Sequence, residues 1–305
     1  MTTAEAERLL ELSREADFLG PDAARWLERL SAERGALENA VRALAESGDA
    51  ERACELAANV WRLWLMKGDV EGGRALLATA LGLDGPPSRD RVRALYADGV
   101  LAFRAGNQAE SKERNEAALA EAQQIGDDEG RSLALVGLSR VALRDGDYGR
   151  VRTLSTEARE LARPLGAGAE AMPLHLLAAG TRLDGELDAA VELYGESLEL
   201  NRRLEDAMFV AMELHNLGHV EVRRGNVDVA KRYFAECADL RSAENPYDVA
   251  MASLNSAALA VADGDRQTGS ELLSRAEQTL AQAAIVLDPD DQSEVDWLRE
   301  QLPPD

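Results

Sequence analysis

The chain of 305 residues contains few of the residues that mark several common protein classes. Its two cysteines, Cys54 and Cys237, are too few for the disulfide framework of a small secreted domain, and we expect Cys237 to be a buried free thiol. Aromatic residues make up 4% of the chain, which favours packed helices over a sheet. There is no apolar run of about 18 residues and no signal-peptide pattern, so the sequence predicts a cytoplasmic protein.

Positive charge is also scarce, because 34 Lys and Arg face 56 Asp and Glu and the net charge is −22. Nucleic acids and anionic membranes both draw on a basic surface, so we expect neither as a partner. The excess of acid either steers basic partners toward the protein or forms a solvated outer face.

Catalytic motifs are missing as well. The sequence contains no phosphate-binding Gly-x-x-x-x-Gly-Lys-[Ser/Thr], no nucleophile elbow, no His-Glu-x-x-His and no Cys-x-x-Cys. We therefore predict that the chain is not an enzyme and takes no cofactor.

What the sequence does contain is a repeat. A glycine followed by Asp, Asn or Glu recurs every 38–40 residues, at Gly68, Gly106, Gly146, Gly185, Gly225 and Gly264. A fixed period of this length is typical of solenoids. Twelve residues after each glycine stands a small residue that would let two helices approach closely: Ala80, Ala118, Ala158, Ser197, Cys237 and Ala276.

The clearest unit, Leu214–Leu240, resembles a tetratricopeptide repeat (TPR). Leu217-Gly218, Ala230 and Phe234 match that family's Leu-Gly, Ala and aromatic positions, although Leu214 replaces its Trp and Ser242 its Pro. The period exceeds the family's basic length of about 34 residues, so the resemblance is to a subclass with long helices.

The resemblance implies an all-α fold, a right-handed superhelix of helical hairpins. We predict an N-terminal helical cap over residues 1–49, repeats of about 39 residues over 50–285, and a capping helix and tail over 286–305. All nine prolines are expected at helix boundaries or in the tail, because a proline inside a helix costs about 3 kcal/mol.

Residues 26–81 carry a second resemblance. The matching runs include Trp26-Leu27-Glu28-Arg29-Leu30, Leu37-Glu38-Asn39-Ala40, Trp61-Arg62-Leu63-Trp64 and Ala80-Leu81. They are similar to the start of the TPR array in large ATP-dependent bacterial transcription regulators of the signal-transducing NTPase class. This implies a sensor or interaction module, either part of a larger regulator or a free-standing relative. The apparent caps and the starting Met1 favour a stand-alone adaptor instead, and an accessory subunit of an enzyme is a third alternative.

In TPR arrays the first helix of each hairpin lines the concave surface, and the resemblance implies a peptide, a protein or a small effector as the ligand there. The candidate binding residues are Arg104, Arg140, Arg144, His175, Arg182, His215, Asn216, His219, Arg223 and Asn255. The arginines suggest a ligand with acidic or carboxylate groups. The alternative is that they pair with neighbouring Glu and Asp.

Two other patterns leave a functional and a structural interpretation open. Asn59, Asn216 and Asn255 each lie nine residues before a turn glycine, where an Asn can pair with the backbone of an extended peptide or serve only packing. His215 and His219 have the i, i+4 spacing of a metal site or a pH-sensitive patch. No further ligands complete a metal set, so we predict no metal and expect a role in polarity or packing.

The stretch 50–66 is too apolar to remain in water. Its Trp61, Trp64 and Leu65 are either buried under residues 1–45 or offered to a partner.

Overall fold

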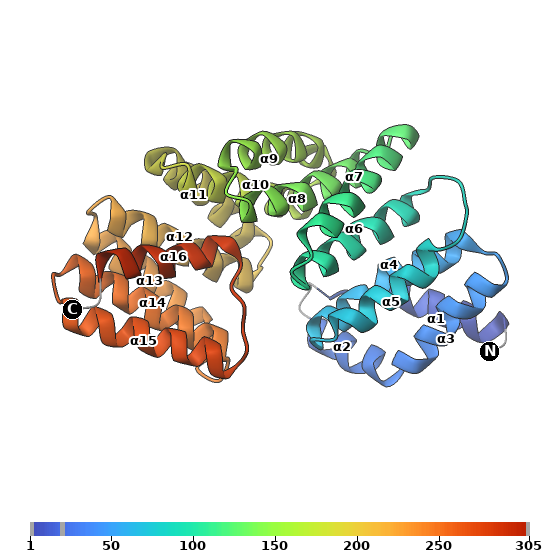
Figure 1. Ribbon diagram of the computed structural model, residues 1–305, viewed down its shortest axis with the longest axis horizontal. Helices are drawn as coiled ribbons and strands as arrows, with labels where there is room; N and C mark the ends of the chain where they lie inside the picture. The colour runs from blue at the N-terminus through green and yellow to red at the C-terminus, as the bar shows by residue number, and fades with distance from the viewer. Residues whose placement is uncertain (1–2, 19–21, 303–305) are drawn as a thin grey trace. The chain divides into compact units, whose positions relative to one another are not determined.

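The computed structural model describes residues 3–18 and 22–302, and the regular structure in these ranges is entirely helical (Figure 1). Short turns join successive helices into hairpins, so the predicted all-α helical-repeat fold is confirmed. A 3₁₀ turn covers Arg163–Leu165. The α-helices are α1 (Thr3–Glu15), α2 (Ala23–Ala32), α3 (Arg34–Glu46), α4 (Ala50–Met66), α5 (Val70–Leu81), α6 (Arg89–Arg104), α7 (Gln108–Ile125), α8 (Asp128–Arg144), α9 (Tyr148–Ala162), α10 (Ala167–Leu183), α11 (Leu187–Arg203), α12 (Ala207–Arg223), α13 (Val227–Leu240), α14 (Pro246–Ala262), α15 (Arg266–Gln282) and α16 (Pro289–Gln301).

Local chemistry explains where the hairpins turn. All six repeat glycines have φ between +73° and +87°, a conformation that only glycine adopts without strain. The residue after the glycine often starts the next helix as its N-cap. The Asp69 carboxylate accepts a hydrogen bond from the Gly72 N–H at 3.0 Å, and Asp265 does the same for Thr268 at 3.1 Å. One dipeptide thus ends one helix and begins the next.

Close helix packing follows from the small residues. The six small residues predicted to lie between paired helices are all fully buried, with 0% exposure. Gly218 on α12 is equally constrained, because a Cβ atom there would lie 2.1 Å from Cε1 of Phe234 on α13. A larger residue at position 218 would therefore separate the two helices.

The chain divides into two compact units. Unit 1 comprises Met1–Val141 with Glu157–Leu165, and unit 2 comprises Ala142–Thr156 with Gly166–Asp305. In unit 1 the α4 residues Trp61 and Trp64 are 4% and 0% exposed and share a core with Leu9, Leu10 and Leu37. Of the two alternatives for this apolar stretch, the structure shows burial under the N-terminal helices.

Unit 2 contains α10–α16, and its last helix completes an apolar core. Val295, Leu298 and Leu302 on the α16 side are at most 8% exposed and pack in one cluster with Leu254 and Leu273. Cys237 is a buried free thiol, as predicted, and its Sγ lies 3.2 Å from the carbonyl oxygen of Ala211.

One expectation was wrong. Pro173 does not lie at a helix boundary but inside α10, which begins at Ala167. Proline is tolerated in the first turn, where its missing N–H has no partner, but position 173 lies beyond that turn. Gly166 has a φ of 112°, and α10 begins at the next residue, so that Pro173 lies inside the helix and not at its start.

No helix in the described ranges is both long enough and apolar enough to span a bilayer.

Candidate functional site

The candidate site is a buried polar face on the first helices of three hairpins in unit 2. Seven of the ten predicted binding residues form this polar face: His175 and Arg182 on α10, His215, Asn216, His219 and Arg223 on α12, and Asn255 on α14. Arg182, His215 and His219 are each only 1% exposed. Arginine is almost never buried to this degree unless it is paired, so the face must have a partner.

That partner is α16 (Figure 1), which packs against α14 and α10 and forms an ion pair with Arg223 of α12. The acids Asp290, Asp291 and Glu294 occupy one side of α16, because positions i, i+1 and i+4 share a helical face. They are 7%, 7% and 0% exposed. An acidic side of the last helix therefore covers the polar face.

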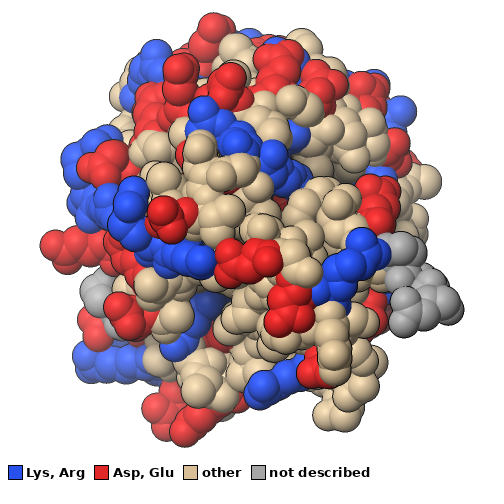
Figure 2. Space-filling model, turned by 90° about the vertical axis from the view of Figure 1, so that its left-hand side faces the viewer, with Lys and Arg blue, Asp and Glu red and all other residues tan. Residues whose placement is uncertain are grey.

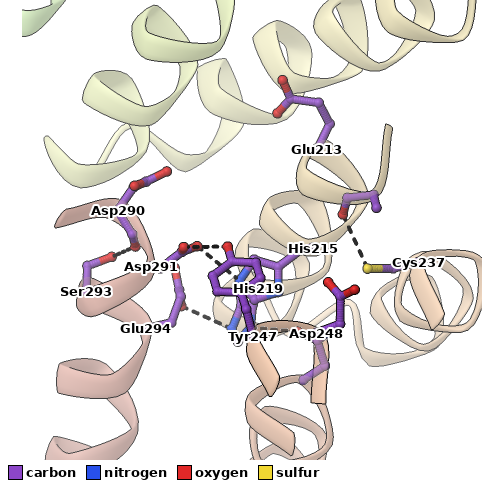
Figure 3. A network of polar contacts seen from close by, with 12 residues as sticks. Glu213, His215, His219, Cys237, Tyr247, Asp248, Asp290, Asp291, Ser293 and Glu294 are labelled. Carbon is purple, nitrogen blue, oxygen red and sulfur yellow. Dashed lines mark hydrogen bonds and ion pairs between the residues drawn. The ribbon is translucent and has the colours of Figure 1, made fainter. Parts of the chain in front are cut away.

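Glu294 is the centre of this contact. Its carboxylate pairs with Arg182 and accepts a hydrogen bond from Arg223 Nη2 at 2.7 Å. It also lies 3.0 Å from His219 Nδ1, and Figure 3 shows these two side chains next to each other. Arg223 also lies over the Trp297 ring, with 5.2 Å between its guanidinium carbon and the ring centroid. Charge-assisted hydrogen bonds of this kind are the strong ones, and here they are shielded from water.

Asp290 makes a second set of contacts. Its Oδ2 lies 3.5 Å from His175 Nε2, and its backbone carbonyl accepts a hydrogen bond from Arg182 Nη2 at 3.1 Å. The other ring nitrogen of His175 lies 3.1 Å from the carboxylate of Glu213 on α12. Glu213 in turn accepts a 2.6 Å hydrogen bond from Ser197 Oγ.

These carboxylates set the charge of His175. Burial opposes an imidazolium, but Glu213 and Asp290 together outweigh burial and raise the pKa of His175 to about 10. Burial likewise opposes an ionised Asp290, yet the His175 contact and Arg182 lower its pKa. His175 and Asp290 therefore form a buried ion pair at neutral pH.

The other two histidines stay neutral. Burial, with the positive charges of Arg241 and Arg182, lowers the pKa of His215 to about 3. Burial, His215 and Arg223 also hold the pKa of His219 well below its usual value. His175 is therefore protonated at neutral pH, whereas His215 and His219 are neutral, although all three lie on first helices of the repeats. No group of three or more His, Cys, Asp or Glu in the described ranges is arranged to hold a metal ion.

Two groups at the contact between α16 and the polar face are poorly matched to their surroundings. Burial and the neighbouring Asp290 raise the pKa of Asp291 to about 7, although Asp291 accepts a 2.7 Å hydrogen bond from the Tyr247 hydroxyl. His215 Nε2 lies 3.8 Å from Asp291, too far for a hydrogen bond.

The three repeated asparagines differ in their hydrogen bonding. Asn59 in unit 1 accepts from Arg93 Nη2 at 2.8 Å and donates to Ser13 Oγ at 3.1 Å. Asn255 Oδ1 lies 3.0 Å from His219 Nε2. Asn216 is 0% exposed, and neither of its amide atoms has a hydrogen-bond partner among the described residues. A buried unsatisfied amide is rare and calls for an explanation.

Three predicted binding residues remain. Arg104 is exposed at the end of α6, and Arg140 Nη1 donates to the Tyr96 hydroxyl at 3.3 Å, both in unit 1. Arg144 lies 4.0 Å from Asp288, just before α16.

The sequence analysis missed the acidic half of the network. The sequence predicts only a cap and tail over residues 286–305, and it does not identify Asp290, Asp291 and Glu294 as partners of the polar face. Their spacing behind the helix-starting Pro289 was a usable signal. Glu213, an acid in the apolar first half of α12, was another.

Comparison with solved structures identifies the fold. A Rap protein complexed with competence and sporulation factor superposes with a TM-score of 0.65 and 14% identity, covering 97% of this chain and 79% of that one. NprR in complex with its cognate peptide NprX gives 0.63 and 13%, covering 97% and 81%. A tetratricopeptide repeat protein from Parabacteroides merdae gives 0.58 and 12%, covering 99% and 100%.

The chain has a TPR-like fold. No protein-family model and no protein of curated function matches the sequence, so the comparisons extend to the fold and no further. The resemblance of residues 26–81 to large ATP-dependent regulators stays a prediction.

Proposed function

We propose that this chain is a non-catalytic scaffold that binds a peptide or protein partner at the polar face of unit 2. The observation that carries the proposal is Asn216, whose buried amide has no hydrogen-bond partner among the described residues, in a face that already holds a helix through polar contacts. An amide that can both donate and accept suits the backbone of a bound peptide.

The similar structures support a peptide as the ligand. The Rap and NprR structures contain a competence and sporulation factor and the peptide NprX, respectively. TPR-like arrays bind along extended surfaces built from successive repeats, and the polar face extends over three of them.

The chemistry of the face argues against catalysis. Ser197, Glu213 and His175 are in contact, but the fully buried Ser197 hydroxyl donates to Glu213 and not to the histidine. A nucleophilic serine needs a neutral histidine as its base. With a pKa of about 10, His175 is protonated at neutral pH and cannot accept that proton.

We place the scaffold in a regulatory protein, because residues 26–81 resemble the start of the TPR array in ATP-dependent transcription regulators. A stand-alone adaptor and an accessory subunit of an enzyme are the alternatives. An NTPase encoded upstream in the same reading frame would select the regulator, and its absence would select the adaptor.

A displayed library of short random peptides, selected on the full chain, tests the proposed site. Enriched peptides should bind at least about fivefold more weakly to Asn216→Ala, since one buried hydrogen bond contributes roughly 1 kcal/mol or more. The matched control is Arg152→Gln on α9, which loses ion pairs with Asp184 and Glu186 at 2.7 and 2.8 Å outside the polar face. If no peptide is enriched, or if Asn216→Ala binds as well as the control, the proposed site is wrong.

A further inference from the structure

The contact between α16 and the polar face has the composition of a reversible interface. Ion pairs form the polar part of this contact, with Asp290 and Glu294 on one side and His175, Arg182 and Arg223 on the other. Val295, Leu298 and Leu302 form its apolar part, in the core cluster of unit 2. A buried ion pair contributes little net stability compared with apolar residues of similar size, because both charges lose their hydration. The same charges regain hydration when the contact opens, so a polar face tolerates exposure better than an apolar one.

The position of α16 in the chain also suits release. A connection over residues 283–288 joins it to α15, and Val286 within that connection is 80% exposed. The pairs that hold α16 join residues far apart in sequence, with 108 residues between Arg182 and Asp290 and 71 between Arg223 and Glu294. Opening this contact breaks none of the hairpin turns.

The fit of α16 is incomplete. Among the described residues Asn216 has no hydrogen-bond partner, His215 Nε2 lies 3.8 Å from Asp291, and Asp291 lies beside the like charge of Asp290. Groups left unsatisfied by one occupant are available to a better one.

We propose that α16 occupies its own binding face as an internal substitute, and that the partner of this protein binds through an acidic amphipathic helix that displaces it. This inference rests on the proposed function and names the class of partner. The partner helix carries acids at positions i, i+1 and i+4, matching Asp290, Asp291 and Glu294. It carries an aromatic residue at i+7, matching Trp297 over Arg223. Apolar residues at i+5 and i+8 match Val295 and Leu298.

The net charge of −22 works against an acidic partner at long range but does not prevent this contact. At physiological ionic strength, charges more than about 8 Å apart are largely screened. Once α16 leaves, the local charge of the face is positive, because Arg182 and Arg223 lose the carboxylate of Glu294.

The test is exchange of α16 in trans. A protease site inserted after Val286 in the full chain allows α16 to be cut from α15 while it stays bound. The probe is a fluorescently labelled synthetic peptide of residues 289–302, and its binding is followed by fluorescence anisotropy. An attached segment competes at an effective concentration of about millimolar. We therefore expect the cut chain to bind the peptide about 100-fold more tightly than the uncut chain.

Three controls show whether the acids decide the exchange. A peptide with Asp290→Asn, Asp291→Asn and Glu294→Gln should bind at least about tenfold more weakly. Arg223→Gln in the cut chain should weaken binding of the acidic peptide similarly, and Arg152→Gln should not. If the cut chain loses helicity on dilution, recovery of the circular dichroism signal with the acidic peptide but not with the neutral peptide is the equivalent positive result.

Failure of exchange in the cut chain, or equal binding of the acidic and neutral peptides, would overturn the displacement proposal. The proposed function has a separate outcome, since peptides of any chemistry that depend on Asn216 in the library selection keep the polar face as a binding site. If the selected peptides bind there but are not acidic helices, only the partner class is wrong.

Discussion

Glu294→Gln is the most informative single substitution, because it removes one charge and almost no volume. The Glu294 side chain is 0% exposed and contacts Arg182, His219 and Arg223. After the change, Arg182 remains charged in a place where its own side chain is also 0% exposed. The substitution therefore tests whether the buried ion pairs hold α16 in place.

Removing one partner of a buried pair typically costs about 3–5 kcal/mol. We expect about 3 kcal/mol, the lower end of that range. The reason is that Arg182 keeps two acceptors, the Tyr194 hydroxyl at 3.2 Å and the Asp290 carbonyl at 3.1 Å. Arg223, with 15% of its side chain exposed, can turn toward water. The expected loss is roughly a hundredfold in the equilibrium between docked and released α16.

The assay uses ¹⁹F NMR of protein labelled with 5-fluorotryptophan. Trp297 is the tryptophan of unit 2, while Trp26, Trp61 and Trp64 belong to unit 1, so the Trp297 resonance reports the release of α16 during a urea titration. Trp297→Phe assigns that resonance.

The matched control is Glu277→Gln, which breaks an exposed ion pair with Arg299 at 2.7 Å in the same unit. Exposed pairs contribute about 0–1 kcal/mol, so the control should shift the Trp297 transition little. The double variant Arg182→Met with Glu294→Leu should recover much of the loss, because an apolar pair removes the uncompensated charge. The reasoning is refuted if Glu294→Gln shifts the Trp297 transition no more than Glu277→Gln does.

Three further predictions follow from single buried groups. The native pKa of Asp291 is raised to about 7, so the unfolded state binds fewer protons between about pH 4 and 7 and stability falls as pH rises through this range. Asp291→Asn should remove that fall, so the urea midpoint of the variant minus that of the wild type should be larger at pH 8 than at pH 5. If this difference is the same at both pH values, the raised pKa of Asp291 is contradicted. Gly218→Ala should destabilise unit 2 by about 1–3 kcal/mol through the clash with Phe234, whereas Gly195→Ala, in open space on α11, should stabilise it by roughly 0.5–1 kcal/mol; equal thermal shifts would refute this packing. Asn216→Leu should raise the melting temperature by removing an unsatisfied amide while abolishing peptide binding, and a lower melting temperature would mean that Asn216 has a structural partner.

The repeat was predictable because its determinants are local. A glycine at positive φ followed by a capping Asp needs only the two helices that it joins, as Gly68-Asp69 shows. The small residue twelve positions later is required by a close contact between helices of the same or the adjacent hairpin. Each rule can be recognised within one repeat, and the sixfold recurrence separates it from chance.

The site was predictable only in its basic half. The positions of Arg182 and Arg223 follow from the repeat, but the identity of their partner does not, because the pairs cross 108 and 71 residues. Periodicity assigns a residue to a face and contains no information about which distant segment covers that face. The same limit explains the histidines, since the charge of His175 depends on Glu213 and Asp290 and not on its own position in the repeat.

The same repeat position has different states in the two units, and this difference indicates where a ligand would bind. Asn59 and Asn216 both stand nine residues before a turn glycine. In unit 1, helix α1 supplies Ser13 as an acceptor for the Asn59 amide, and Arg93 satisfies its oxygen. In unit 2, the Asn216 amide has no hydrogen-bond partner among the described residues. A covering helix that serves only as a cap gains nothing from leaving a buried amide unpaired, since an apolar residue at that position would be more stable. An amide without a partner among the described residues, in a face that α16 contacts partly through ion pairs, is the arrangement expected of a face whose best partner is another chain.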